Sequence, residues 1–445
     1  MDRVRRLEQY QDFISRIYPE KHKDTGNTNA DKILSRTATF QVTDACNLAC
    51  SYCYQIHKGT KKMSFETAKK YIELLLTGDK GMGVYINPTL SPAIVLDFIG
   101  GEPLLEVELM DRIVDYFRMR AIELEHPWAN MFSICISSNG TLYFDDKVRQ
   151  FLEKNKGHMS FNVTIDGNKE LHDSCRRFPD GRPSYDLAVA AAKDWMSKGY
   201  YMGSKITIAP GNLQYLYDAI LHMVELGYED INANCVYEKG WTTEHAKLYY
   251  HQLKKIADYW YENDLYQSHY LALFREEFYQ PKEETDLDTW CGGTGLMIAC
   301  DPDGNIFPCI RYMESSLGGQ QEPLMIGNVD DGVGQTKCSK DCINCLQAIN
   351  RRTQSTDECF YCPIAEGCSY CSAYNYQENG TPDSRCTYIC IMHKAEALAN
   401  VYFWNNYYKK HNIDKIFKNY CPEEWALEII DKDELNMLNE LQERS

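Results

Sequence analysis

The sequence predicts an α/β protein, a partial (β/α)6 TIM-like barrel followed by a cysteine-rich C-terminal domain. Two observations carry this prediction. From about residue 37 to residue 240, short β-rich runs alternate with amphipathic helical patterns, which is typical of βα units around a parallel sheet. Further along, twelve of the 19 cysteines crowd between Cys291 and Cys390. The chain therefore divides into a barrel and a second functional region.

Composition limits the classes of function. With 445 residues, of which 44% are hydrophobic, the chain can build a sizeable core in two or three domains. A net charge of -17 disfavours binding to nucleic acid or to an anionic membrane. The N-terminus lacks the apolar core of a signal peptide, and no run of about 18 apolar residues occurs. We expect a cytoplasmic protein, in which 19 cysteines indicate metal or cluster ligation rather than disulfides.

The expected elements follow in chain order. Residues 1–35 should form a helical extension, because Arg3 to Ile17 read as one charged helix. The barrel, 36–240, then pairs each β-rich run with a helical pattern: 39–42 with 64–76, 93–98 with 109–124, 132–137 with 145–155, 160–165 with 184–199, 205–209 with 212–227, and finally 231–237. In the fifth helix, Asn212 is a predicted cap and Gly227 a predicted left-handed C-cap.

Three further segments complete the predicted organisation. Residues 241–290 should form a helical bridge, 291–395 the cysteine-rich domain, and 396–445 the C-terminal helices. Within the second of these, residues 301–307 indicate a hairpin. The stretch 338–371 has little periodicity and should fold poorly without metal.

Cys46, Cys50 and Cys53 form a loop directly after the first expected strand. In a parallel barrel, chemistry collects at the C-terminal ends of the strands. Three thiolates on a short loop can hold three irons of a cubane cluster and leave the fourth iron open. Zinc normally takes four ligands from paired Cys or Cys/His groups, and only His57 follows nearby. The loop therefore favours a cluster over zinc.

This loop, with Tyr52 before its last cysteine, resembles the signature of the radical S-adenosylmethionine (radical SAM) superfamily. The resemblance implies that the open iron binds the amino and carboxylate groups of SAM, and that one electron cleaves SAM to a 5′-deoxyadenosyl radical. Gly100-Gly101-Glu102-Pro103, after the second expected strand, resembles the family's GGEP motif, which receives the SAM ammonium.

Two other residues match family patterns at the ends of later strands. Ser138, in the segment 137–141, resembles the position that contacts the SAM ribose, although such a stretch also suits a helix-entry turn. Arg176, in the pattern between Asp166 and Ser184, resembles the arginine that approaches the SAM carboxylate, and its alternative role is a solvent-exposed charge. Neither pattern identifies a catalytic residue on the substrate side.

The later cysteines resemble the SPASM domain of peptide-modifying radical SAM enzymes, so the resemblance covers roughly residues 35 to 395. It implies two auxiliary [4Fe-4S] clusters and hence three in all. One would be held by Cys291, Cys309 and Cys371, and the other by Cys359, Cys362, Cys368 and Cys386. Two residues separate Cys368 from Cys371 where three are usual. Zinc remains an alternative, because CxxC pairs bind it equally well.

A surplus group, Cys338-x3-Cys342-x2-Cys345, repeats the spacing of the first loop without a preceding strand or a following GGEP. We expect Cys345 or Cys342 to supply the fourth ligand of the first auxiliary cluster. The alternatives are an iron left open for a substrate thiolate, and ligation by Cys390. The remaining thiols, Cys135, Cys175, Cys235 and Cys421, are expected to be packing residues.

The resemblance implies an oxidoreductase that abstracts a hydrogen from a ribosomally made precursor peptide and forms a thioether from a substrate Cys sulfur. Formylglycine-type oxidation, carbon–carbon cross-linking and epimerisation are alternatives within enzymes. A non-catalytic iron–sulfur carrier or zinc-stabilised binding module is the alternative from another class, but it leaves GGEP unexplained. An electron donor such as flavodoxin or ferredoxin is implied. Some 35 residues before the first strand leave no room for a winged-helix leader-binding domain, so the leader should be recognised by a separate protein, the barrel or the added helices.

Overall fold

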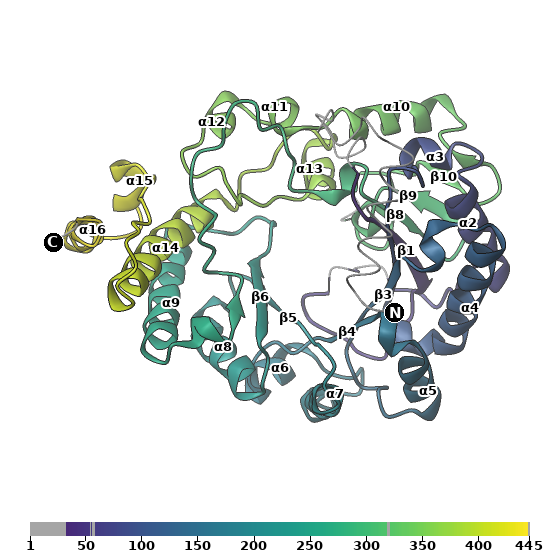
Figure 1. Cartoon of the computed structure of the whole chain (residues 1–445), viewed down its shortest axis with the longest axis horizontal. Coiled ribbons are helices and arrows are strands. Elements are labelled where there is room, and N and C mark those ends of the chain that lie inside the picture. Colours follow the sequence, from purple (N-terminus) through teal and green to yellow (C-terminus); the bar gives the residue numbers. More distant parts are fainter. Residues whose placement is uncertain (1–32, 54, 56–57, 318–320, 444–445) are drawn as a thin grey trace.

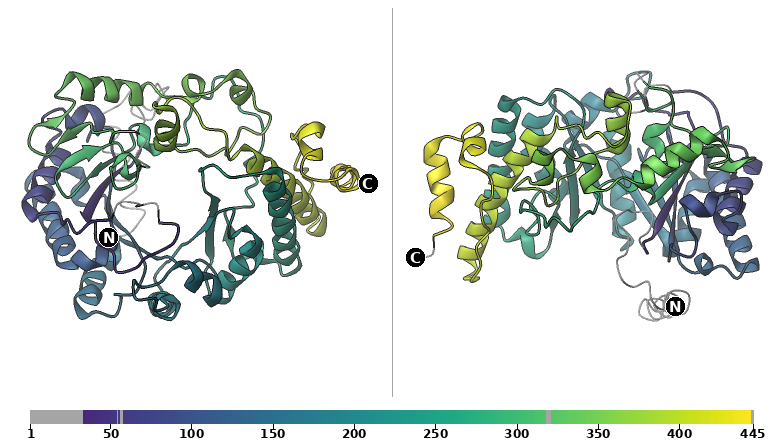
Figure 2. Two further views of the ribbon diagram at one scale, coloured as in Figure 1. Left: turned by 180° about the vertical axis from the view of Figure 1, so that it is seen from behind. Right: turned by 90° about the horizontal axis from the view of Figure 1, so that it is seen from above.

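The computed structural model describes residues 33–53, 55, 58–317 and 321–443. The expected helix between Arg3 and Ile17 lies outside the described residues. Strands line the inner side of a curved wall and helices cover its outer side, while the C-terminal region completes the ring (Figures 1 and 2). The predicted α/β class is therefore confirmed.

The six predicted barrel strands are all present: β1 (Arg36–Thr43), β2 (Ile94–Gly100), β3 (Phe132–Ser138), β4 (Met159–Val163), β5 (Ser204–Ile208) and β6 (Asp230–Cys235). Pairing is parallel from β1 to β4 and again between β5 and β6. The strands fall into two sheets, because β4 and β5 are not hydrogen-bonded neighbours. The barrel is partial, as predicted, with a break between its fourth and fifth strands.

The outer helices of the barrel are α2 (Phe65–Thr77), α4 (Val107–Glu123), α5 (Asp146–Asn155), α7 (Tyr185–Ser197) and α8 (Leu216–Glu225). Shorter turns between them are α3 (Met82–Tyr85), α6 (Lys169–Cys175), η2 (Pro103–Glu106), η3 (Pro127–Ala129), η4 (Lys156–His158) and η5 (Leu213–Tyr215). Helix α2 begins where the Ser64 side chain accepts a hydrogen bond from the Thr67 backbone and ends at Gly78, whose φ is 70°.

Asn212 stands at the predicted N-cap position, before η5, but its side chain does not cap the helix. Its side chain donates to the Thr207 carbonyl and accepts from the Ala209 backbone, so it closes the loop after β5 and makes no cap bond. Local spacing cannot distinguish these two uses of an Asn side chain, since both are short-range hydrogen bonds. Gly227 does adopt the left-handed conformation expected of it, with φ 91°.

The two faces of the barrel strands differ in polarity. Phe40, Phe98 and Ile136 are fully buried, and the ring of Phe40 packs against Tyr71 of α2. Alternate residues point the other way, toward the barrel interior, as the period of two in a strand requires. There the Thr39 hydroxyl donates to a carboxylate oxygen of Asp97 over 2.9 Å. The sheet therefore presents an apolar face to its helices and a polar face to the interior.

The cysteine-rich region is continuous with the barrel. Strand β8 (Met297–Cys300) pairs in parallel with β1 and forms the predicted hairpin with β9 (Asn305–Phe307). The next strands, β10 (Gly327–Asn328) and β11 (Gly332–Val333), extend the sheet to eight strands. This arrangement joins the second cysteine region rigidly to the strand that precedes Cys46.

Only the first half of the expected bridge is helical. This half contains the helix α9 (Thr243–Glu262), the turn η6 (Leu265–Gln267) and the short strand β7 (Tyr270–Leu271). Strand β7 pairs in parallel with β6. Residues 272–291 form neither helix nor strand. The elements that follow are η7 (Gly292–Thr294), η8 (Ile310–Tyr312), α10 (Lys337–Gln347), α11 (Arg351–Gln354), α12 (Asp357–Phe360), α13 (Ser372–Asn379), α14 (Cys390–Lys410), α15 (Glu423–Leu427) and α16 (Lys432–Glu440).

Helix α14 packs along α9, and α15 and α16 lie at the outer end of the molecule (Figures 1 and 2). The predicted return to helix at the C-terminal end is thus present. Among the described residues, no helix combines the length and the hydrophobicity that a membrane crossing requires.

Candidate active site

The loop that carries Cys46, Cys50 and Cys53 follows β1 and is held from the opposite side. The Ala49 backbone donates to the Arg177 carbonyl over 2.7 Å, and the Ser51 backbone donates to the Cys175 carbonyl over 3.0 Å. All three thiols are half-buried. A segment more than 120 residues later in the sequence therefore holds the loop at the carboxyl end of the strands.

The two glycines of GGEP are required by close contact with this loop. The Gly101 backbone donates to the Thr43 carbonyl, and the Glu102 backbone donates to the Ala45 carbonyl. A Cβ added at Gly101 would lie 2.3 Å from the Ala45 oxygen and 2.7 Å from Cβ of Cys46. Only glycine allows β2 to approach the loop this closely. The motif thus supports the loop as well as presenting Glu102.

Glu102 lies at the centre of a buried hydrogen-bond network. Its side chain is 1% exposed and accepts from the Ser138 hydroxyl over 2.8 Å, the Asn139 backbone over 2.9 Å and the Leu104 backbone over 3.1 Å. Burial raises the pKa of this carboxyl, while the donors from Asn139 and Ser138 lower it. A carboxylate offers about four acceptor positions, so roughly one remains for a ligand.

Two asparagines extend this network to the cysteine loop. The Asn139 side chain donates to the Asn47 side chain, and Asn47 in turn donates to the Thr141 hydroxyl, each over 2.8 Å. Sequence reasoning did not single out Asn47, because an Asn between two cysteines has no signal of its own. Ser138, predicted to contact ribose, here donates to Glu102.

Tyr52, Asp166 and Arg176 form a second cluster beside the loop. The Tyr52 hydroxyl and Nε of Arg176 both donate to the Asp166 carboxylate, the latter over 2.8 Å. Nη1 of Arg176 lies 3.9 Å from Sγ of Cys50. The side chain of Arg176 is only 13% exposed, which argues against the alternative of a solvent-exposed charge. A positive charge next to Cys50 lowers its pKa, against the larger raising effect of burial.

The predicted ligands of the first auxiliary cluster, Cys291, Cys309 and Cys371, come together from three separate segments. A Cβ added at Gly293 would lie 3.4 Å from Sγ of Cys291 and 3.6 Å from Sγ of Cys309. Burial and the neighbouring Cys291 thiol raise the pKa of Cys371 to about 11. The Ser372 hydroxyl lies 3.1 Å from Sγ of Cys291. The two-residue spacing before Cys371 does not prevent this juxtaposition.

The predicted fourth ligand of this group, Cys345 or Cys342, stays a prediction. Both residues are on α10, where the Cys342 thiol approaches Tyr376. The ring of Tyr376 packs 5.8 Å from that of Tyr312, and Tyr312 is the residue that neighbours the Cys291 and Cys309 thiols. Helix α10 also contacts η7, the turn that directly follows Cys291.

The second thiol group lines a cavity of about 900 Å³, which is bordered by Cys359, Cys362, Cys368 and Cys390. Burial and the Cys368 and Cys359 thiols raise the pKa of Cys390 to about 12. Nη2 of Arg385 donates to Sγ of Cys368 over 2.8 Å. His393 also lines the cavity, and its Nδ1 has no hydrogen-bond partner among the residues that the structure describes.

Cys386, which the resemblance assigned to this group, does not border the cavity. Its Sγ accepts from the Asn379 side chain over 3.4 Å, and its pKa is raised by burial and by Glu378. Local spacing cannot separate Cys386 from Cys390, because the two lie only four residues apart. The path of the chain into α14 decides which thiol faces the other three.

The chemistry of these thiols fits iron–sulfur clusters. Across residues 33–53, 55, 58–317 and 321–443, no three Cys, His, Asp or Glu side chains converge on the position of a single metal ion. A cubane binds each thiolate to a separate iron, so its ligands surround a space, whereas zinc requires its sulfur ligands at about 2.3 Å. Burial keeps Cys371 and Cys390 protonated, and a bound metal replaces such protons.

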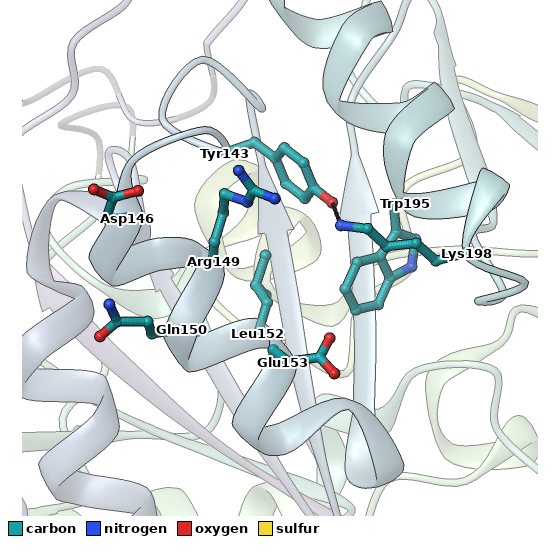
Figure 3. Close-up of a pocket in the computed structure, with 8 residues that line it drawn as sticks. All are labelled: Tyr143, Asp146, Arg149, Gln150, Leu152, Glu153, Trp195 and Lys198. Carbon is teal, nitrogen blue, oxygen red and sulfur yellow. Dashed lines mark hydrogen bonds between the residues drawn. The ribbon is translucent and has the colours of Figure 1, made fainter.

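A further pocket lies on the outer side of the barrel, between α5 and α7 (Figure 3). It has a volume of about 570 Å³ and is lined by Tyr143, Arg149, Trp195 and Lys198 among others. Nζ of Lys198 donates to the Tyr143 hydroxyl over 3.1 Å. Among the residues that the structure describes, no cysteine lines this pocket.

Comparison with known proteins identifies the family of one long segment of the chain. Residues 40–214, which include the cysteine loop and GGEP, match the model of the radical SAM superfamily. This segment is a radical SAM domain. The family implies that it binds SAM and a [4Fe-4S] cluster, and the structure presents Cys46, Cys50 and Cys53 at the expected end of the barrel. The predicted radical SAM segment and the predicted α/β fold are therefore confirmed.

Relatives of the radical SAM domain include two curated proteins. A serine-type anaerobic sulfatase-maturating enzyme of Bacteroides thetaiotaomicron is 34% identical over 178 residues, which are 39% of this chain and 39% of the relative. The antilisterial bacteriocin subtilosin biosynthesis protein AlbA of Bacillus subtilis is 22% identical over 290 residues, 63% of this chain and 56% of AlbA. The chain spans less than two thirds of the length of either relative.

One solved structure extends the similarity of fold to nearly the whole chain. It is native anSMEcpe with bound AdoMet and Kp18Cys peptide, with a TM-score of 0.56 and 16% identity. It covers 92% of this chain and 99% of its own. The cysteine-rich region after the radical SAM domain therefore has a counterpart in a known fold.

Proposed function

We propose that this radical SAM protein is an oxidoreductase that modifies a ribosomally made peptide and forms a thioether from a substrate Cys sulfur. The observation that carries the proposal is the presence of two further half-buried thiol groups in a chain whose radical SAM loop is complete. Resemblance to a protein of subtilosin biosynthesis and to a fold solved with a peptide supports a peptide substrate.

The residues of the radical SAM domain have defined tasks in this proposal. Cys46, Cys50 and Cys53 hold the SAM cluster, which when bound with SAM supplies a 5′-deoxyadenosyl radical. Glu102 uses its remaining acceptor position for the SAM ammonium. Arg176 stands beside Cys50 as a positive charge for the SAM carboxylate.

We assign residues 291–395 to a SPASM-type domain with two auxiliary [4Fe-4S] clusters. Cys291, Cys309 and Cys371 hold the first and leave one iron open to a substrate thiolate. The second is held by Cys359, Cys362, Cys368 and Cys390, with Cys390 in place of Cys386 because it is the thiol that borders the cavity. Residues 241–290 and 396–445 brace the two domains through the α9–α14 packing.

Thioether formation needs a sink for one electron. The substrate C–H bond loses a hydrogen atom to the deoxyadenosyl radical, the Cys S–H loses its proton, and the new C–S bond leaves one electron over. An auxiliary cluster can accept that electron, whereas zinc has no second redox state. A flavodoxin or ferredoxin would reduce the SAM cluster for each turnover.

Substrate recognition is assigned to the polar interior of the barrel and to a separate leader-binding protein. Thr39, Asp97 and Lys205 lie on the inward face of β1, β2 and β5, and Lys205 is exposed. Such groups can bind the polar backbone of an extended peptide.

Coexpression with a Cys-containing peptide encoded beside this protein tests the proposal by mass spectrometry. A thioether should lower the peptide mass by two hydrogens and protect one Cys from alkylation by iodoacetamide. Anaerobic reduction of the protein with SAM should release 5′-deoxyadenosine. Release without any change in candidate peptides would argue against the thioether, and no release at all would argue for a non-catalytic module.

A second candidate is oxidation of a Ser or Cys to formylglycine, favoured by the 34% identity to a serine-type sulfatase-maturating enzyme. The same mass spectra separate the two reactions. Formylglycine made from Cys loses the sulfur and acquires an aldehyde that reacts with hydrazides, while a thioether keeps the sulfur.

A further inference from the structure

The two auxiliary thiol groups differ in how the arginine beside each of them is paired. Arg311 lies in η8, two residues after Cys309 of the first thiol group. Its Nη2 donates to a carboxylate oxygen of Glu238 over 2.7 Å. The positive charge beside the first thiol group is therefore balanced by a carboxylate.

The arginine beside the second thiol group is bonded to one of the thiols instead. Nη2 of Arg385 donates to Sγ of Cys368 over 2.8 Å and lies 3.3 Å from the Cys368 carbonyl oxygen. The guanidinium also lies over the ring of Tyr370, 4.6 Å from its centroid. In the part of the chain that the structure describes, no carboxylate forms an ion pair with Arg385. The positive charge beside the second thiol group is therefore not balanced.

A buried histidine adds a second polar group to the same cavity. His393 is 8% exposed and follows Cys390 by one turn of α14, so the two side chains share one face of the helix. Its Nε2 lies 3.4 Å from the hydroxyl of Ser369, the residue after Cys368. Its Nδ1 is buried without a partner among the described residues. Since buried polar groups are normally hydrogen-bonded, this nitrogen indicates a partner inside the cavity that His393 lines.

We propose that Arg385 and His393 give the second auxiliary cluster a higher reduction potential than the first. The inference rests on the two auxiliary clusters of the proposed function. Reduction adds one negative charge to a cluster, and the potential depends on net charge and on hydrogen bonds to the sulfurs. The unbalanced guanidinium at Sγ of Cys368 stabilises the reduced form through a charge-assisted hydrogen bond. Nδ1 of His393 can donate a further one, because the Ser369 hydroxyl can donate to Nε2.

This order of potentials sets the direction of electron transfer. One electron is left over when the C–S bond of the thioether forms. A first cluster at the lower potential passes that electron to the second cluster at the higher potential. An oxidised carrier of the flavodoxin or ferredoxin type then removes it from the second cluster.

Redox titration followed by electron paramagnetic resonance tests the inference on the reconstituted full-length protein. The background is the variant with all three cysteines of the SAM loop changed to Ala, because it lacks the signal of the SAM cluster. In this background, Arg385→Gln should lower the higher of the two midpoint potentials by at least about 59 mV, a tenfold change for one electron, and leave the lower one unchanged. Arg385→Lys keeps the charge and should restore most of the loss.

Lys394→Gln is the matched control for charge in this cavity. Lys394 lines the same cavity, but its Nζ is paired with the Glu428 carboxylate over 3.5 Å. Its removal should shift the higher potential by less than half as much. His393→Phe should lower the same potential with iron unchanged, and it replaces Arg385→Gln if that variant loses iron.

Four results would overturn the inference. They are an unchanged higher potential in Arg385→Gln, an equal shift in Lys394→Gln, a shift confined to the lower potential, and loss of about four irons from His393→Phe, which would make His393 a cluster ligand. Iron near zero in the background protein would instead refute the auxiliary clusters of the proposed function. Thioether formation together with an unshifted potential would refute this inference alone.

Discussion

At the scale of single residues, the radical SAM domain depends on contacts that a motif does not reveal. The φ of Gly101 is not positive, so its backbone conformation does not require glycine. However, its Cα hydrogen faces the Ala45 carbonyl and Cβ of Cys46, where a side chain would not fit. Glu102 accepts hydrogen bonds from three donors, one in its own turn and two in the segment that ends β3. The motif GGEP is therefore a packing element of the cysteine loop as much as a binding element.

Gly101→Ala should displace the cysteine loop, because the new methyl group would meet backbone at 2.3 Å. We expect the loss of about four irons per chain, the content of one cubane, and a destabilisation of roughly 1–3 kcal/mol. Iron analysis and thermal melting measure the two effects. Gly157→Ala is the matched control, since no atom lies within 4 Å of its added Cβ, and equal iron loss in both variants would contradict the explanation.

Glu102→Gln should weaken SAM binding about tenfold or more while the cluster remains, because charge-assisted hydrogen bonds contribute roughly 1.5–3 kcal/mol. The NH2 group of the new Gln side chain would also face one of the three groups that now donate hydrogen bonds to the carboxylate, and two donors cannot bond to each other. Calorimetric titration with SAM measures the affinity, and iron content reports the cluster. Unchanged SAM affinity would reduce Glu102 to a structural carboxylate.

At the scale of elements, short caps and loop paths decide which side chains meet. Cys386 and Cys390 are one helical turn apart in sequence spacing, but Cys386 precedes α14 while Cys390 begins it. At the start of the helix, the Cys390 thiol faces the cavity, whereas the Cys386 thiol lies beside Asn379. The two cysteines therefore offer a matched pair of variants.

Cys390→Ala should remove a ligand of the second auxiliary cluster and lower iron by up to about four atoms per chain, whereas Cys386→Ala should leave iron unchanged. Iron analysis and electron paramagnetic resonance of the reduced proteins make the comparison. The opposite outcome, with iron lost only on removal of Cys386, would restore the ligand set implied by the sequence resemblance.

The His126 cap predicts sensitivity to acid. The Trp128 backbone donates to Nδ1 of His126 over 3.1 Å, which requires the neutral ring, and burial lowers the pKa of His126 to about 4. An unfolded histidine has a pKa of about 6.5, so between these values the unfolded state binds more protons and stability falls as the pH falls. After discounting for partial exposure, we expect a loss of roughly 1 kcal/mol.

Melting temperatures at pH 7 and pH 5 test this cap. His126→Asn keeps an acceptor at the cap position without titrating, so its melting temperature should fall less over this range than that of the wild type. An identical fall of the melting temperature in both proteins would show that groups other than His126 cause the acid sensitivity.

At the scale of the whole molecule, one sheet joins the two cysteine regions. Strand β1 leads into the SAM loop and also pairs with β8 of the C-terminal region. The auxiliary thiols are consequently held at a defined position relative to the SAM loop.

The intact chain should carry about twelve irons after anaerobic reconstitution, four for each of three cubanes. Removal of Cys359 and Cys362 should abolish modified peptide while some uncoupled 5′-deoxyadenosine still forms, with circular dichroism to verify the barrel. Iron and zinc analysis, together with chromatography of the nucleoside, provide the readout. About four irons with two zincs would make the C-terminal region a structural binding module.

The sequence by itself determined the features that depend on neighbours in the chain. Strand and helix periodicity located all six barrel strands, and the spacing of Cys46, Cys50 and Cys53 identified the radical SAM loop. These features are local, because a strand face repeats every two residues and a loop of eight residues brings its own thiols together. GGEP was recognised for the same reason.

Only the tertiary structure decided the contacts between distant segments. It separated β4 from β5, joined β8 to β1, and placed Cys390 rather than Cys386 beside the second thiol group. It also brought α10 into contact with η7, the turn that follows Cys291. These contacts depend on how helices pack and where the chain turns. Packing results from many weak contacts between distant residues, and no short motif encodes them.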